Sequence, residues 1–157
     1  MPIHRILAPI DLSTDSLNAL TYARNLAKRC GAELVILHVV EPIDLGDSAE
    51  WHLSQRELEL LDEQRRARSA QLERLATDLK KQGQRVRTMV QRGAPAQVIV
   101  VDTAKRTRSD LVVMGTRGRT GLAHMLIGSV AERVVRSAHC PVLTVRRVAR
   151  KPRASKK

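Results

Sequence analysis

The chain has 157 residues, 43% of them hydrophobic, which is enough for one domain with a buried core and short for two. Its longest stretch without a charged residue covers twelve positions, Thr120 to Ala131, well below the roughly 18 to 20 apolar residues of a membrane-spanning helix. Pro9 and Asp11 interrupt the N-terminal segment before a secretion signal could form, and Cys30 and Cys140 are the only cysteines. We therefore expect a cytoplasmic protein without a disulfide framework or a membrane span.

Positive charge is concentrated at the C-terminus. The 28 Lys and Arg residues against 16 Asp and Glu give a formal charge of +12. Seven basic residues lie in the last twelve positions, RRVARKPRASKK, so positions 1–145, with 21 basic and 16 acidic residues, carry only +5. Aromatic stacking platforms for nucleic acid cannot be built from Tyr22 and Trp51 alone, which disfavours a nucleic-acid partner. We predict a domain over 1–147 and a basic, disordered tail over 148–157.

Short apolar runs alternate with longer amphipathic stretches, the pattern that βαβ units leave in a sequence. Four of the five runs are almost continuously hydrophobic, as parallel strands covered on both faces require. The third run, RVRTMVQ, alternates apolar and polar residues and is typical of an edge strand. We predict strands over Arg5–Pro9, Glu33–Val40, Arg85–Gln91, Asp110–Gly115 and Pro141–Arg146, and helices over Thr14–Arg29, Asp47–Gln82, Pro95–Arg106 and Ser129–Ala138.

Two of the predicted helices carry further signals. Ser13 is a candidate N-cap of the first helix, and Gly31 follows its end. The long charged stretch has leucines at heptad positions between 58 and 79, interrupted by Arg65 and Arg68. A coiled coil is one interpretation, but the two arginines favour an amphipathic helix that lies on a sheet.

Right-handed crossovers join these elements into an α/β fold, an open, doubly wound, five-stranded parallel sheet of order 3-2-1-4-5, which is Rossmann-like. Strands one and four are then neighbours, and the helices that follow them lie on opposite faces. Ligands of such sheets bind in the crevice at the carboxyl ends of these two strands. The sequence therefore directs attention to Asp11 and to the residues after Gly115.

A glycine-rich segment follows the fourth strand. In GTRGRTGLAHMLIG, four of the eight glycines of the chain fall within fourteen residues, 115–128. The segment lacks the Gly-Lys-Ser/Thr ending of a Walker A loop, and its first two glycines are three apart rather than two, so it is not a dinucleotide fingerprint.

Physical chemistry still favours an anion at this segment. Glycines let backbone amides approach a phosphate closely, and Gly128-Ser129 opens a predicted helix whose first amides have no internal partner. Arg117 and Arg119 can add positive charge. The alternative is a connection that serves only tight packing, and spacing alone does not decide between the two.

The spacing Gly115-x2-Gly118-x9-Gly128-Ser129 resembles the nucleotide-binding signature of the universal stress protein family. A first strand ending in Pro-x-Asp and a second ending in His-Val precede it in that family's order, and the resemblance covers about residues 1 to 147. It implies a site in which Asp11, in Pro9-Ile10-Asp11, lies beside the nucleoside. The remaining implied contacts are Val39 with adenine through its backbone, Met114 in the pocket wall, Gly115 and Gly118 against ribose and phosphates, and Gly128, Ser129 and Val130 with the β- and γ-phosphates.

The resemblance implies ATP as the ligand, with Mg²⁺ bridging its phosphates rather than bound by protein side chains. Asp11 could instead cap the first helix, His38 is expected to satisfy a hydrogen bond at a strand end, and His139 and Cys140 are expected to be packing residues. No general base stands out in the glycine-rich segment. We expect a nucleotide-dependent stress-response regulator with at most slow ATP hydrolysis, and the alternatives are a dedicated ATP-hydrolysing enzyme and a nucleotide-free dimeric scaffold.

The fifth strand is expected at the open edge of the sheet opposite the third. An exposed apolar edge invites pairing, so we predict a homodimer in which the two last strands, PVLTVRR, associate antiparallel, as the resemblance also implies.

Overall fold

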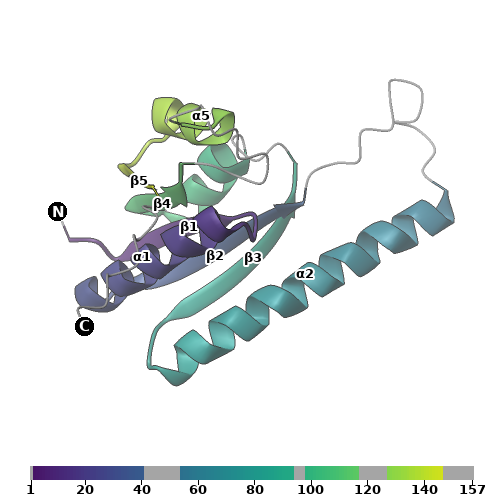
Figure 1. Ribbon diagram of the computed structural model, residues 1–157, viewed down its shortest axis with the longest axis horizontal. Coiled ribbons are helices and arrows are strands. Elements are labelled where there is room, and N and C mark those ends of the chain that lie inside the picture. The colour runs from purple at the N-terminus through teal and green to yellow at the C-terminus, as the bar shows by residue number, and fades with distance from the viewer. Residues whose placement is uncertain (1, 41–53, 94–97, 117–126, 147–157) are drawn as a thin grey trace, which may run out of the picture.

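A five-stranded parallel sheet forms the centre of the computed structural model, with strand order β3-β2-β1-β4-β5 (Figure 1). The structure describes residues 2–40, 54–93, 98–116 and 127–146. The predicted fold class and strand order are confirmed, and the strand ends agree with the predictions to within one residue. The strands are β1 (Arg5–Ile10), β2 (Glu33–Val40), β3 (Val86–Arg92), β4 (Leu111–Gly115) and β5 (Val142–Val145).

The helices follow the predicted order with two differences. Part of the long helix predicted from Asp47 lies outside the described residues, and Ser54 is not helical. The described part of the helix predicted over Pro95–Arg106 is helical, but it is a π-helix followed by one α-turn; four consecutive β-branched residues, 98–101, weaken the preference for a regular α-helix. The elements are α1 (Thr14–Cys30), α2 (Gln55–Lys81), η1 (Val98–Ala104), α4 (Lys105–Thr107) and α5 (Ser129–Ser137).

Hydrophobic side chains cover both faces of the sheet. On β1, Ile6, Ala8 and Ile10 point to the face packed by α1 and α2, whereas Leu7 points to the face packed by η1 and α5. This alternation follows from the two-residue period of a strand, and burial of both faces explains why the strands are nearly continuous in apolar residues. In the described ranges, no helix is long and apolar enough to cross a membrane.

The predicted signals at the ends of α1 are confirmed. The Ser13 hydroxyl accepts a hydrogen bond from the Ser16 amide at 3.2 Å, which satisfies one of the unpaired donors of the first turn. At the other end, Gly31 adopts a left-handed φ of 64°, and its amide donates to the carbonyl of Ala27.

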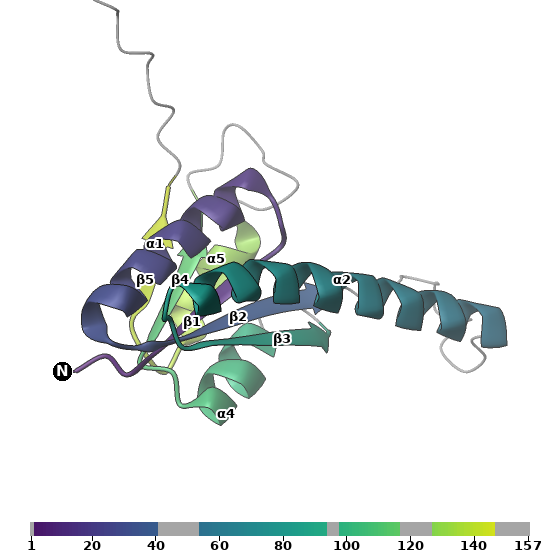
Figure 2. The same ribbon diagram turned by 90° about the horizontal axis from the view of Figure 1, so that it is seen from below.

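Helix α2 packs on the sheet mainly through its second half. Leu72, Ala76 and Leu79 are buried against the face that α1 also covers, whereas Leu58 and Leu60 are 50% and 49% exposed. Figure 2 shows the reason, since the first half of α2 extends past the ends of β2 and β3. The interpretation of α2 as an amphipathic helix on a sheet is therefore confirmed for this second half.

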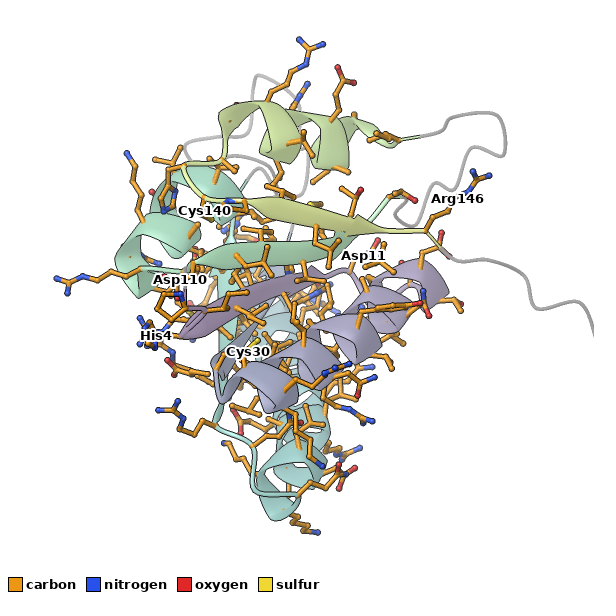
Figure 3. The ribbon with its side chains drawn as sticks, turned by 90° about the vertical axis from the view of Figure 1, so that its left-hand side faces the viewer. His4, Asp11, Cys30, Asp110, Cys140 and Arg146 are labelled. Carbon is orange, nitrogen blue, oxygen red and sulfur yellow. The ribbon has the colours of Figure 1, made fainter. Side chains whose placement is uncertain are left out.

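A carboxylate links β1 to the start of β4 at the amino-terminal edge of the sheet, the end at which all its parallel strands begin. Asp110 Oδ2 accepts hydrogen bonds from the amides of His4 and Arg5 at 2.8 and 2.9 Å, and Figure 3 shows His4 and Asp110 together at this edge. These bonds, led by the one from His4, hold the pKa of Asp110 below its ordinary value, because they favour the ionised form. The folded protein therefore favours the ionised form of Asp110.

Asp110→Asn is expected to remove part of the acid sensitivity of the fold. A lowered folded-state pKa contributes stability above the unfolded-state pKa of about 3.9, and this contribution is lost as pH falls through the folded-state value. The variant keeps one acceptor oxygen but not its charge, so near pH 7 we expect it to be about 1 to 2 kcal/mol less stable. Urea unfolding between pH 7 and pH 3 should show the two proteins converging at low pH. Asp78→Asn, at an exposed position on α2, is the control, and parallel curves for Asp110→Asn and wild type would contradict the prediction.

Candidate functional site

Strands β1 and β4 separate toward their carboxyl ends. Their register covers only Ile6 with Leu111 and Leu7 with Val112, whereas β1 stays paired with β2 as far as Ile10. The cause lies in Pro9. The carbonyl of Arg5 accepts from the Asp110 amide, so alternate β1 residues, Pro9 included, face β4, and Pro9 has no N–H to donate there. The central strands thus part at the edge where parallel α/β sheets bind ligands.

Asp11 shapes the turn that leaves β1. Its Oδ1 accepts a hydrogen bond from the Ser13 amide at 2.9 Å, and the intervening Leu12 has a φ of 66°, which is rare for a residue with a side chain. The N-cap of α1 is Ser13, so the alternative that Asp11 caps this helix is wrong. Asp11 instead fixes a tight turn at the carboxyl end of β1.

His38 of β2 forms a hydrogen bond to the same end of β1. Its ring is buried, and Nδ1 donates to the carbonyl of Ile10 at 2.8 Å, which confirms the strand-end hydrogen bond predicted for this residue. Because a carbonyl only accepts, this bond places the proton on Nδ1. The bond fixes the last β1 residue before Asp11.

The beginning of α5 lies beside the carboxyl end of β4. The Gly128 amide donates to the Thr116 carbonyl at 2.7 Å, and the Thr116 amide donates to Val145 of β5 at 3.2 Å. Gly128 is the N-cap and offers no side-chain acceptor. The first intrahelical bond runs from Glu132 to Gly128, so three amides, those of residues 129–131, have no acceptor within the helix. They form a donor cluster with the positive end of the helix dipole.

The described residues predicted for the site lie at the ends of β1, β2 and β4 and in the first turn of α5. Val39, Met114 and Val130 pack in one cluster on the α5 face of the sheet. Pro9 and Gly115 are buried at the ends of β1 and β4, and Gly128 is half-buried, whereas Ser129 is exposed at the first turn of α5. The predicted residues Arg117 and Gly118 lie outside the described residues.

The metal-ligating side chains seen in the structure are scattered. Among residues 2–40, 54–93, 98–116 and 127–146, no three His, Cys, Asp or Glu side chains gather as a metal site would need. Cys140 packs against the α5-side core, and burial raises the pKa of its thiol, which disfavours the thiolate that binds metals. The packing role expected for His139 is wrong, because this side chain is exposed.

Two features of the site were missed in the sequence. Thr116 ties α5 to both β4 and β5 through its backbone, and no side-chain pattern reveals this. Leu12 takes a backbone conformation that glycine or asparagine usually adopts, so a leucine at this position does not indicate the turn. The one available signal was the Asp11-x-Ser13 spacing, which is typical of an Asx turn.

An open, doubly wound sheet whose central strands part between two opposed helices defines a Rossmann-like α/β protein. The model described as "Universal stress protein family" matches residues 2–146, and the chain belongs to this family. Universal stress protein MJ0531 of Methanocaldococcus jannaschii is 38% identical over 146 residues, which cover 91% of this chain and 82% of the relative.

Solved structures support the same assignment. The structure of hypothetical protein MJ0577, also from Methanocaldococcus jannaschii, has a TM-score of 0.82 at 28% identity and covers 96% of this chain and 100% of that one. A universal stress protein solved in complex with cAMP has a TM-score of 0.66 at 26% identity and covers 92% and 98% of the two chains. Nucleotide binding thus occurs in a structural neighbour.

Proposed function

We propose that this universal stress protein is an ATP-binding regulator whose site is the crevice between the carboxyl ends of β1 and β4. The observation that carries the proposal is the parting of the two strands toward Pro9, together with the start of α5 at the carboxyl end of β4, where Gly128 bonds to Thr116. The crevice supplies a turn at Asp11 on one side and a cluster of amide donors on the other. The cAMP complex of a structural neighbour supports an adenine nucleotide as the ligand.

The described residues fit a nucleotide polyphosphate. Backbone amides at a helix start bind phosphate oxygens, and Ser129 adds a hydroxyl donor at the same turn. Glu132 in the first turn pairs with Arg136 at 3.0 Å, which partly offsets its negative charge. Val39, Met114 and Val130 offer an apolar wall for a purine ring. Mg²⁺ would be held by the phosphates themselves.

The arrangement favours binding over catalysis. Rapid hydrolysis requires a group that orients the attacking water, and the carboxylate of Asp11 already accepts a hydrogen bond from its own turn. The ligand would therefore act by its presence, through a change of shape or partner rather than through turnover. A rate above about 1 per second would overturn this choice in favour of a dedicated ATPase.

Isothermal titration calorimetry with ATP and Mg²⁺ tests the proposal directly. We expect saturable binding of ATP. Competition by ADP, AMP and cAMP then shows, from their relative affinities, how many phosphates the site recognises. Bound ligand should also raise the melting temperature, because it stabilises only the folded state. No heat and no melting shift at millimolar ATP would leave the nucleotide-free scaffold as the better account.

We also propose a homodimer through β5, the edge strand opposite β3. The Leu143 side chain on this strand is 41% exposed, although its backbone is part of the sheet. Leu143→Arg should place like charges opposite or near one another across a two-fold axis and shift the protein to monomer, raising the dimer dissociation constant at least about tenfold. Light scattering after size exclusion measures this, with Leu58→Arg as a control at a leucine of α2 that is also largely exposed. A wild-type monomer at micromolar concentration would contradict the proposal.

A further inference from the structure

Basic side chains collect at the amino-terminal edge of the sheet, away from the candidate site. Figure 3 shows His4 and Asp110 at this edge, and Asp11 and Arg146 at the opposite ends of the strands. Five exposed residues border the edge, from the last turns of α1 and α2, the entry to β3 and the end of α4. We call them the amino-edge patch: Lys28, Arg29, Lys81, Arg85 and Arg108.

Three hydrogen bonds show that these segments adjoin one another. Gln84, just after α2, donates to the carbonyl of Arg24 in α1 at 2.9 Å, and Arg85 donates to the carbonyl of Gly31 at 2.5 Å. On the other face, the guanidinium of Arg5 in β1 donates to the carbonyl of Thr107 at the end of α4. The ends of three helices thus share one edge.

The acidic residues at the starts of the strands do not neutralise the patch. Glu33 binds Arg5 at 2.5 Å and Arg87 at 3.6 Å, and Asp110 accepts two backbone amides. In contrast, the side chains of Lys28, Arg29 and Lys81 make no ion pair or hydrogen bond within the described part of the chain. Asp78 is the one acidic residue in the last two turns of α1 and α2.

The topology explains why basic residues gather where the strands begin. Cations are favoured at helix C-termini and acids at N-termini, each by about 0.3 to 1 kcal/mol. In a parallel sheet every crossover helix ends at the edge where the next strand begins, so the C-terminal cations of α1, α2 and α4 add up at one edge. Asp15 and Glu132 lie in the first turns of α1 and α5, toward the other edge.

We propose that the amino-edge patch binds the phosphate backbone of a nucleic-acid duplex. Long, unpaired Lys and Arg side chains contact phosphates without reading sequence. The aromatic-poor composition disfavours single-strand binding, which needs stacking, but duplex binding through phosphates does not. The large exposed apolar residues of the described chain, such as Tyr22, Leu58 and Val135, lie outside the patch, so insertion into a lipid surface is not supported.

The test compares two triple variants of the full chain with equal charge change. Lys28→Gln, Arg29→Gln and Lys81→Gln together remove three patch charges, and Arg56→Gln, Arg65→Gln and Arg66→Gln together remove three from the exposed half of α2. Fluorescence anisotropy with a labelled duplex of roughly 20 base pairs should show about tenfold weaker binding for the patch variant at ~0.1 M salt. The slope of log affinity against log salt should also fall by about 2 to 3, while the α2 variant stays within about twofold of wild type.

Parallel titrations with a DNA duplex, an RNA duplex and anionic phospholipid vesicles identify the ligand. A loss of affinity for either duplex that is confined to the patch variant supports the proposal. The duplex that wild type binds more tightly identifies the ligand as DNA or RNA. Equal losses in both variants would overturn it, because general charge or the basic tail would then account for binding. Unchanged affinity of the patch variant, or tighter binding to vesicles than to both duplexes, would also overturn it. All six positions are exposed, so both variants should melt within a few degrees of wild type.

Discussion

Gly128→Val should abolish measurable ATP binding while leaving the fold intact. Gly128 has φ −75° and ψ 157°, a conformation that valine adopts readily, so the backbone tolerates the change. Valine is a poor N-cap, which we expect to cost no more than about 1 kcal/mol. Its branched side chain would stand beside the three amides of α5 that have no acceptor within the helix and that we assign to the phosphates. We expect the ATP dissociation constant to rise at least about 100-fold, or about 2.7 kcal/mol.

Calorimetry of both proteins with ATP and Mg²⁺ measures this loss, and the melting shift caused by ATP should disappear with it. Ser137→Val, at the exposed last position of α5, is the matched control and should bind ATP like wild type. If Gly128→Val binds ATP with unchanged affinity, the start of α5 does not hold the phosphates and the proposed site is wrong.

The architecture could be predicted because each strand and helix carries its own local signal. Continuous apolar runs such as LVILHVV indicate strands buried on both faces, and the alternation in RVRTMVQ marks β3 as an edge. Ser13 and Gly31 mark the ends of α1 by their intrinsic backbone preferences. The type of helix at η1 could not be predicted in this way, since a shift from α to π hydrogen bonding depends on the surrounding packing.

The position of the candidate site in the fold could be predicted from the sequence, but the backbone geometry of the site could not. Parallel topology places Asp11 and Gly115 at the same edge, so their neighbourhood follows from strand order alone. The opening of the sheet depends on which neighbour Pro9 faces, and that is known only once Arg5 is seen paired with Asp110. The turn at Leu12 is imposed by the hydrogen bond between Asp11 and Ser13, against the preference of leucine.

Leu72→Ala and Leu58→Ala should differ sharply in effect although both change a leucine of α2. Leu72 is fully buried against the sheet, so its truncation leaves a cavity and should lower the free energy of unfolding by about 3 kcal/mol. Leu58 is 50% exposed on the half of α2 that extends past the sheet, and its truncation should change stability by less than about 0.5 kcal/mol. Alanine favours helix at both positions, so helix propensity does not separate the two.

Urea unfolding followed by circular dichroism gives both values, and the melting temperature of Leu72→Ala should fall by roughly 6 to 12 °C. A large loss for Leu58→Ala would mean that the first half of α2 is packed in solution, against the sheet or against a second molecule. If the loss of stability depended on protein concentration, the contact would be with a second molecule, because association makes the free energy of unfolding depend on concentration. Small and equal losses would instead show that α2 contributes little to the core, and the layer of α1 alone would then have to cover that face of the sheet.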